Sequence, residues 1–539
     1  MTSSRTSNLK RTRCKPVFVL LSLLVVIVFS EVLLAQQPVT LSIDASVTGA
    51  KIERDIFGQF AEHLGQGIYE GVWVGPDSRI PNTRGIRNDV VAALKALRVP
   101  NVRWPGGCFA DEYHWRNGIG PANKRPATLN PNWGGVIEPN SFGTHEFMDF
   151  LQQIGAEAYL SVNVGSGTPH EAADWLEYLT TAQPTALEKE RAANGHPGPY
   201  KIAYLGIGNE SWDCGGNMTP EYYLSQMKIY SRFVRNFNPA QQDKDKMLKI
   251  AVGPGGDGPR WTEWTDAIMK AYAQHTWSWD IDGLSMHNYT VIKWPPAYKS
   301  VGFGETEYAE ILKKTLEMDA LINTHSAIMD KYDPQKKVAL VVDEWGAWYE
   351  KLPGSHEGFL AQQNSQRDAV LAALNLNIFA RHADRVRMAN IAQMVNVLQA
   401  MILTDKEKMV LTPTYHVFKM YVPFQDSTFV PVTFNAGIYK HGELTLPRID
   451  AIAAKDKSGT LWLAITNLDP SQPVEIDLAL AASTAKSATG ETLTAPKVDS
   501  INTFDAPETV VPKRISVQAR DGKLALKLAP ASVTVVSVE

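Results

Sequence analysis

Two glutamates, Glu210 and Glu344, each follow a short apolar run and could form a catalytic pair. Glu210 closes the segment KIAYLGIGNE, and Glu344 closes KVALVVDE. Apolar, partly β-branched runs of this length, bounded by Gly, Asn or Asp, predict buried strands. A carboxylate at the carboxyl end of a strand lies where α/β barrels carry out their chemistry. Two such carboxylates match the needs of retaining sugar hydrolysis, in which one group protonates the leaving oxygen and the other attacks the anomeric carbon.

The neighbours of the two glutamates differ, as the two roles require. Asn209 precedes Glu210, and its amide could hydrogen-bond a sugar hydroxyl near the reacting centre. Asp343 and Trp345 flank Glu344 with a like charge and an aromatic ring. A single carboxylate at a strand end is more often a solvated rim residue than a catalytic one. Because two carboxylates occur in the same position after a strand, the catalytic interpretation is favoured over that of rim residues.

Eight strand-like runs precede residue 400, and they predict an α/β fold of the (β/α)8 TIM barrel type. Helical patterns separate them, such as the one from residue 88 with Leu94 and Leu97 on one face, and no GxGxxG or Walker motif suggests a nucleotide site. Glu210 would then end the fourth strand and Glu344 the seventh. The runs lie at 56–62, 101–104, 156–164, 201–208, 249–254, 281–287, 337–344 and 387–396.

The sequence pattern changes after TPTYHVFKMYVPF (412–424), which we expect to be the last helix of the barrel. Short alternating runs punctuated by turns follow, including GTLWLAITNL and PVEIDLAL, and this pattern is typical of an antiparallel β-sandwich. We therefore predict a catalytic barrel at 51–424 and a C-terminal antiparallel β-sandwich domain at 425–539. The segment VTLSIDAS (39–46) precedes the barrel and predicts one more strand.

Residues 1–36 have the pattern of a secretory signal peptide. The basic stretch KRTRCK is followed by an apolar run at 17–35 that ends in Ala35. The run is long and Glu31 interrupts it, so an uncleaved membrane anchor is the alternative. We expect a secreted or periplasmic protein that contacts a membrane only if this segment is uncleaved. Without residues 1–36 the chain has 48 Lys and Arg against 56 Asp and Glu, a net charge of -8. This acidic balance and the lack of basic clusters in that part of the chain argue against nucleic acid and favour a neutral ligand.

The chain has three cysteines, and one of them lies in the N-terminal segment. Cys108 and Cys214 show neither CxxC nor Cys/His ligand spacing, so we expect free thiols. His63, His114 and His287 also lack metal-ligand spacing, and we expect them to be structural. The sequence predicts no catalytic metal and no cofactor.

Several strings of the chain occur together and in order: FGQFAEHLG (57–65), NVRWPGGCFADEYHWRNGIGP (101–121), GIGNES (206–211), SMHNY (285–289), VVDEWGAWY (341–349) and AQMVNVLQAMILT (392–404). In this combination they resemble the α-L-arabinofuranosidases of glycoside hydrolase family 51. The match runs from about residue 40 to the end of the chain, and the combination is far more specific than any single string.

The resemblance implies a retaining enzyme on a (β/α)8 barrel, with a sandwich that an N-terminal strand at 37–50 completes. It places the acid/base on Glu210 and the nucleophile on Glu344. Many relatives have an asparagine after the Gly-Gly where this chain has Cys108, so the donor at that position stays open. The substrate-binding residues that the resemblance implies are Glu62, Cys108, Trp133, Asn209, Tyr289, Trp348 and Gln393.

We therefore predict a retaining, exo-acting α-L-arabinofuranosidase that removes arabinofuranosyl side groups from arabinoxylan, arabinan or derived oligosaccharides. One alternative is a retaining endo-glucanase or endo-xylanase that uses the same two glutamates on the same barrel. A second is a catalytically inactive carbohydrate-binding protein, which the presence of both carboxylates argues against. The resemblance also implies a homo-oligomer.

Overall fold

The computed structural model describes residues 39–481, 486–520 and 524–539. The predicted signal peptide or anchor at 1–36 lies outside these residues. Within the described part of the chain, no helix is both long enough and apolar enough to cross a membrane.

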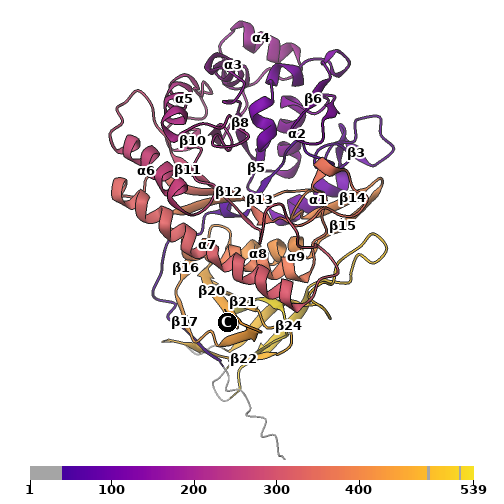
Figure 1. Ribbon diagram of the computed structural model, residues 1–539, viewed down its shortest axis with the longest axis vertical. Coiled ribbons are helices and arrows are strands. Elements are labelled where there is room, and N and C mark those ends of the chain that lie inside the picture. The colour runs from indigo at the N-terminus through magenta and orange to yellow at the C-terminus, as the bar shows by residue number, and fades with distance from the viewer. Residues whose placement is uncertain (1–38, 482–485, 521–523) are drawn as a thin grey trace, which may run out of the picture. The chain divides into compact units, whose positions relative to one another are not determined.

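Eight parallel strands close into a barrel, and this confirms the predicted fold class (Figure 1). Each of the eight predicted runs overlaps one barrel strand. The last strand pairs with the first, so that Ile391 lies beside Gln59. In order around the barrel the strands are β2 (Gly58–Phe60), β5 (Asn101–Trp104), β8 (Glu157–Val162), β9 (Tyr204–Ile207), β10 (Leu248–Ala251), β11 (Gly283–Thr290), β12 (Ala339–Ala347) and β13 (Val386–Ala392).

The helices begin where the sequence supplies caps. Thr168, Thr219 and Thr412 each precede a proline, and each side chain accepts a hydrogen bond from the backbone N–H three residues later. Thr-Pro suits a helix start because threonine satisfies a free N–H and proline has none to satisfy. The helices are α1 (Asn88–Leu97), α2 (Thr144–Ile154), α3 (Pro169–Thr180), α4 (Ala186–Ala193), α5 (Pro220–Phe233), α6 (Pro259–Ala273), α7 (Glu305–Tyr332), α8 (Gln366–Arg381) and α9 (Pro413–Met420).

Short hairpins extend the loops between these elements. Their strands are β3 (Asn82–Thr83) with β4 (Ile86–Arg87), β6 (Thr128–Asn130) with β7 (Val136–Glu138), and β14 (Ile402–Asp405) with β15 (Lys408–Leu411). The turn between β6 and β7 carries Trp133, which contributes to the site described below.

Two sheets form the predicted β-sandwich and enclose an apolar layer of their own, which includes Leu41, Ile476 and Leu526. One sheet has the order β17 (Val432–Phe434), β1 (Val39–Ile43), β22 (Val474–Leu480), β25 (Leu524–Leu528). The other has the order β16 (Thr428–Val430), β20 (Ile449–Lys455), β21 (Leu461–Asn467), β26 (Ser532–Val538), β23 (Ser487–Leu493), β24 (Lys513–Gln518), and a hairpin joins β18 (Ile438–His441) to β19 (Leu444–Pro447).

The first strand, β1, lies inside its sheet. It pairs antiparallel with β17 and parallel with β22, so that Leu41 is opposite Phe434 on one side and Leu478 on the other. The chain therefore starts one sheet, builds the whole barrel, and returns to complete that sheet.

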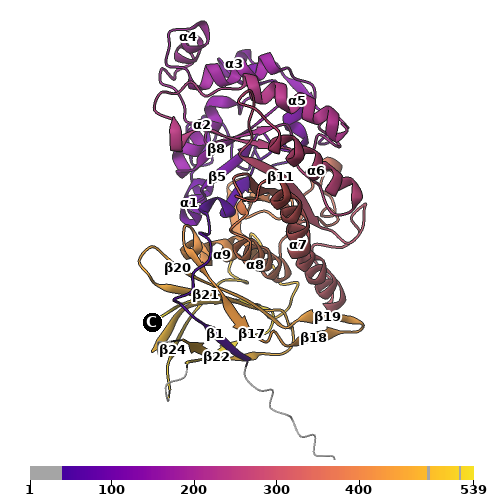
Figure 2. The same cartoon turned by 90° about the vertical axis from the view of Figure 1, so that its left-hand side faces the viewer.

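Helix α8 joins the barrel to the sandwich. Its residues 366–380 are all buried, and it contacts β20, β21 and β26. Asn377 and Arg381 each donate a 2.8 Å hydrogen bond to Asp450 of β20. Figures 1 and 2 both show α7, α8 and α9 beside the sandwich strands. One apolar cluster runs from the barrel helices through α8 to the sandwich residues Ile452 and Val533.

Candidate active site

Glu210 and Glu344 meet at the carboxyl end of the barrel. Glu344 lies within β12, three residues before the strand ends, whereas Glu210 follows β9 by three residues. A carboxylate oxygen of each glutamate and a ring nitrogen of His287 lie within 4.8 Å of one another. The two strands that the sequence indicated therefore bring both carboxylates to one place.

A tight turn presents Glu210. Its φ of 38° falls in the left-handed region, which non-glycine residues seldom adopt. The Glu210 carbonyl accepts hydrogen bonds from the backbone N–H of Asp213 at 2.7 Å and of Gly215 at 3.1 Å. Such a conformation persists only where the surrounding structure fixes it.

His287 on β11 contacts three carboxylates. Its Nδ1 lies 2.8 Å from Glu210 Oε1 and 3.4 Å from Glu344 Oε2, and its Nε2 lies 3.4 Å from Asp343 Oδ1. From the sequence, His287 was expected to be structural, because it has no metal-ligand spacing. His287 and Tyr289 are two residues apart in one strand and so share a face, and that alternation could have identified it.

The charges around the two glutamates shift their protonation. Burial and the charge of Glu344 raise the pKa of Glu210, and the hydrogen bond from His287 opposes this rise. Burial alone would lower the pKa of His287, but Glu344, Asp343 and Glu210 outweigh it and raise the pKa to about 10. His287 is therefore a cation at neutral pH, held between carboxylates.

A buried arginine braces the other side of this cluster. Arg103 on β5 is 1% exposed, and it contacts Glu344 Oε2 at 3.1 Å and Asp343 Oδ2 at 3.5 Å. It also donates a hydrogen bond to Asn209 Oδ1. The hydroxyl of Tyr289 donates to Glu344 Oε1 at 2.6 Å. Both oxygens of Glu344 are therefore held by donors.

Glu62 lies next to this pair and accepts three hydrogen bonds. The donors are the backbone N–H of Phe109 at 3.0 Å, Trp133 Nε1 at 2.8 Å and Gln393 Nε2 at 2.9 Å. Burial and the charge of Glu344 raise its pKa to about 7. A Cβ at position 106 would lie 2.3 Å from Glu62 Cγ, so the close approach requires Gly106.

A cavity of about 820 Å³ opens above these residues. Of the nine predicted site residues, eight line it, whereas Asn209, which is 1% exposed, does not. Trp348 packs edge-on against Tyr289, with ring centroids 4.9 Å apart. The cavity also extends to Trp212, Trp261 and Trp294. Its volume is therefore larger than that of one pentose ring.

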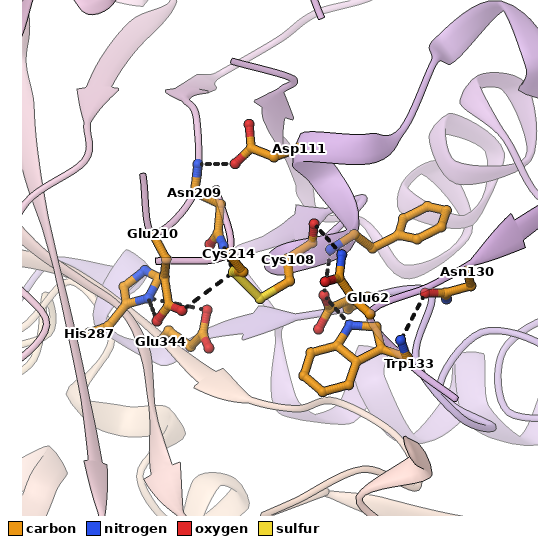
Figure 3. The surroundings of a disulfide bond; sticks show 12 residues. Glu62, Cys108, Asp111, Asn130, Trp133, Asn209, Glu210, Cys214, His287 and Glu344 are labelled. Carbon is orange, nitrogen blue, oxygen red and sulfur yellow. Dashed lines mark hydrogen bonds and ion pairs between the residues drawn. A yellow bond between two sulfur atoms is a disulfide. The ribbon is translucent and has the colours of Figure 1, made fainter. Parts of the chain in front are cut away.

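Cys108 and Cys214 form a disulfide, with Cα atoms 5.5 Å apart, so the expectation of free thiols was wrong (Figure 3). Cys108 opens the 3-10 helix η2 (Cys108–Glu112) after β5, and Cys214 lies in the turn after β9. The two positions are 106 residues apart, and their spacing gives no signal of pairing. The loops meet because β5 and β9 both pair with β8, so that the two loops leave the same end of the barrel.

Two groups of side chains in the described residues have atoms close enough to hold a metal ion, namely Glu210, His287 and Glu344, and the two cysteines with Glu210. The cysteine sulfurs are bonded to each other, and His287 already hydrogen-bonds Glu210. The absence of a metal and of a cofactor stays a prediction.

Known proteins resemble this chain over most of its length. Residues 93–289 match the family model "Alpha-L-arabinofuranosidase 1 domain", and residues 343–532 match "Alpha-L-arabinofuranosidase C-terminal domain". An "Intracellular exo-alpha-L-arabinofuranosidase" of Bacteroides ovatus is 44% identical over 94% of this chain and 96% of the relative. The crystal structure of the GH51 arabinofuranosidase from Xanthomonas axonopodis pv. citri superposes with a TM-score of 0.89 at 50% identity, and covers 93% of this chain and all of that one.

The predicted secreted or periplasmic location is contradicted by these relatives. The Bacteroides ovatus protein is named intracellular. So is an "Intracellular exo-alpha-(1->5)-L-arabinofuranosidase" of Halalkalibacterium halodurans, which is 27% identical over 81% of this chain and 83% of the relative. The prediction rested on residues 1–36 alone, where an apolar run after basic residues outweighed the interruption by Glu31.

Proposed function

Because this chain belongs to the α-L-arabinofuranosidases of glycoside hydrolase family 51, we propose that it removes terminal arabinofuranosyl groups with retention of anomeric configuration. Its substrates are arabinoxylan, arabinan or oligosaccharides derived from them. The observation that carries the proposal is the approach of Glu210 and Glu344 to within 4.8 Å, atom to atom. Retaining glycosidases place their carboxyl groups about 5 to 5.5 Å apart, which leaves no room for an attacking water.

Glu344 is the nucleophile in this proposal. Arg103 and Tyr289 each hold one of its oxygens, so the free lone pairs can point toward the anomeric carbon. Attack by Glu344 forms a covalent glycosyl ester and breaks the bond to the leaving oxygen. Arg103 and His287 lie beside the Glu344 carboxylate that makes this attack.

Glu210 is the acid and then the base. Its raised pKa keeps the proton that the leaving oxygen needs in the first step. Once Glu344 is esterified its negative charge disappears, so one cause of that raised pKa is removed. Glu210 can then ionise and take a proton from the water that hydrolyses the ester.

The remaining cavity residues bind the sugar. Glu62 has charge and lone pairs for ring hydroxyls, and Trp133 and Trp348 offer flat apolar faces to sugar C–H groups. An exo mode is favoured over the endo-acting alternative because two relatives are named exo enzymes. The division into a barrel at 51–424 and a sandwich at 425–539 with the strand from 37–50, and a homo-oligomeric assembly, also belong to this proposal.

Two variants test the roles of the glutamates. Glu344→Ala should abolish turnover of every substrate, because no glycosyl ester can form. Glu210→Ala should keep the first step on a 4-nitrophenyl arabinofuranoside, whose leaving group needs little protonation. It should lose about 10²- to 10⁴-fold on natural oligosaccharides, which do need it. Equal losses on both substrates would contradict the acid/base role of Glu210.

The products test the stereochemistry and the mode of cleavage. Proton NMR of the first-formed sugar should show the α-anomer before mutarotation, and an initial β-anomer would contradict retention. Incubation with arabinoxylan oligosaccharides should release only arabinose, whereas shortened xylan chains would favour the endo-acting alternative.

A further inference from the structure

A disulfide bond lies against the proposed acid/base residue and is not used in the mechanism above. Figure 3 shows the Cys108–Cys214 bond between Glu210 and Glu62. The sulfur of Cys214 lies 3.7 Å from Glu210 Oε2 and 3.7 Å from Asn209 Nδ2. A disulfide sulfur has no proton, so in this state it contacts Glu210 without donating to it.

The bond joins two loops that both shape the site. Cys108 begins η2, which follows the Gly-Gly that accommodates Glu62, and it lines the cavity. Cys214 lies in the turn that presents Glu210 in its left-handed conformation. The sulfur bridge therefore links the wall of the sugar pocket to the turn that carries the acid.

A second connection between the same loops runs beside the disulfide. Asp111 of η2 is 2% exposed, and its Oδ2 accepts a hydrogen bond from the backbone N–H of Asn209 at 2.9 Å. Its Oδ1 accepts from Val164 N at 2.7 Å and Gly165 N at 2.8 Å, at the end of β8. A Cβ at Gly215 would lie 2.7 Å from Asp111 Oδ2, so the turn packs tightly on this carboxylate.

We propose that η2 clamps the acid/base turn through two ties, the Cys108–Cys214 disulfide and the Asp111 hydrogen bonds, and that the disulfide sets the position of the Glu210 carboxylate. Cys214 and Asp111 are positioning residues, since they act through Glu210 and its neighbour. The inference rests on the proposed acid/base role of Glu210.

The disulfide is the tie that chemistry can remove. A dithiol would transfer two electrons and two protons to the protein, breaking the sulfur–sulfur bond to give two cysteine thiols while the dithiol becomes a cyclic disulfide. A thiol at position 214 would then place a proton donor next to Glu210, and the turn would be held by Asp111 alone. Steps that need Glu210 should slow, and the first step on an activated substrate should not.

Alanine variants test this most directly, because a serine hydroxyl would add a new donor beside Glu210. Cys214→Ala and Cys108→Ala should each lower kcat/KM on arabino-oligosaccharides by about 10- to 100-fold, the loss expected from a small misplacement of a catalytic group. In Cys214→Ala, whose side chain does not line the cavity, the rate of 4-nitrophenol release in the first turnover should change little. The double variant should be no worse than either single variant, because both remove the same bond.

Reduction of the wild-type protein gives an independent measurement. Alkylation under denaturing conditions should find Cys108 and Cys214 protected before treatment with a dithiol and modified after it. The treated enzyme should lose activity on oligosaccharides, regain it on reoxidation, and show a shifted alkaline limb in its pH profile. The double alanine variant should not respond to the dithiol.

Three results would overturn the inference. They are free thiols in the untreated protein, an unchanged pH profile after proven reduction, and equal losses on both substrates in Cys214→Ala. Glu210→Ala separates this inference from the function on which it rests. If that variant shows the dependence on leaving group and the cysteine variants do not, the clamp alone is wrong.

Discussion

At the scale of single residues, the site depends on charged side chains that are largely buried and close together. His287 contacts the three carboxylates of Glu210, Asp343 and Glu344, and Arg103 contacts the last two. In a low-dielectric site such charges interact strongly, so removal of one group should change the protonation of the others.

His287→Asn should move the alkaline limb of the kcat/KM profile to higher pH. The His287 cation lowers the pKa of Glu210, so its loss lets Glu210 keep its proton further into the alkaline range. The acid is active when protonated, and the limb therefore moves upward, while the altered site should lower the maximal rate by about 10- to 100-fold. The pH profile of the exposed control His170→Asn should match the wild type, and an unmoved limb in His287→Asn would contradict the assignment.

Glu62→Gln should weaken substrate binding without abolishing the chemistry. The change keeps the size of the side chain but removes its charge, and the new amide N–H would face donors that now point at Glu62. Hydrogen bonds to charged groups contribute roughly 1.5 to 3 kcal/mol, so kcat/KM should fall about 10- to 100-fold. Steady-state kinetics against the exposed control Glu407→Gln would measure this, and unchanged kinetics would remove Glu62 from the sugar site.

The sequence predicted the residues whose signal is local. Glu210 and Glu344 follow apolar runs, and the neighbouring strings resembled a family. The environment of His287 and the pairing of Cys108 with Cys214 were missed because both depend on which strand ends lie close together at the mouth of the barrel. The sequence around one residue does not show which distant segments will lie beside it in the fold.

At the scale of elements, α8 is the helix on which both parts of the molecule depend. Its burial on all sides is unlike that of an ordinary barrel helix, which shows one face to solvent. The run DAVLAALNLNIFA is typical of a helix. Its second face is buried because the sandwich strands β20, β21 and β26 pack against it. The strand runs were predicted well because they are short, apolar and bounded by turns.

Leu376→Ala should lower the free energy of unfolding by about 2 to 5 kcal/mol, because this α8 side chain is 1% exposed and its truncation leaves a cavity. Denaturant titration followed by fluorescence would measure the loss. The barrel and the sandwich should still unfold in one transition, since α8 packs against both. The control Leu129→Ala, at a site 64% exposed, should change stability by less than about 0.5 kcal/mol. Two separate transitions would contradict the shared core.

At the scale of the whole molecule, the sandwich is assembled from both ends of the described chain. Strand β1 provides Leu41 and Ile43, which are almost wholly buried, and it separates β17 from β22. No residue of β1 lines the cavity of the proposed active site. Its contribution is therefore to stability.

A chain that starts at residue 49 should unfold at lower denaturant concentration than one that starts at residue 37. The loss should be at least about 4 kcal/mol, because two buried aliphatic side chains and the centre of a sheet are removed. Activity measured at low temperature should persist, since the barrel keeps its catalytic residues. Equal stability of the two chains would show that β1 is dispensable.

The position of β1 also has a consequence for synthesis on the ribosome. The segment VTLSI emerges early, but its partners β17 and β22 begin at Val432 and Val474. Because chains are synthesised at about 5 to 20 residues per second, β1 remains without its partner strands for roughly 20 to 90 seconds. During that time it is an unpaired, aggregation-prone β segment. The last hundred codons therefore determine whether the first strand is protected, and a nascent chain that stalls before residue 474 leaves it without its parallel partner.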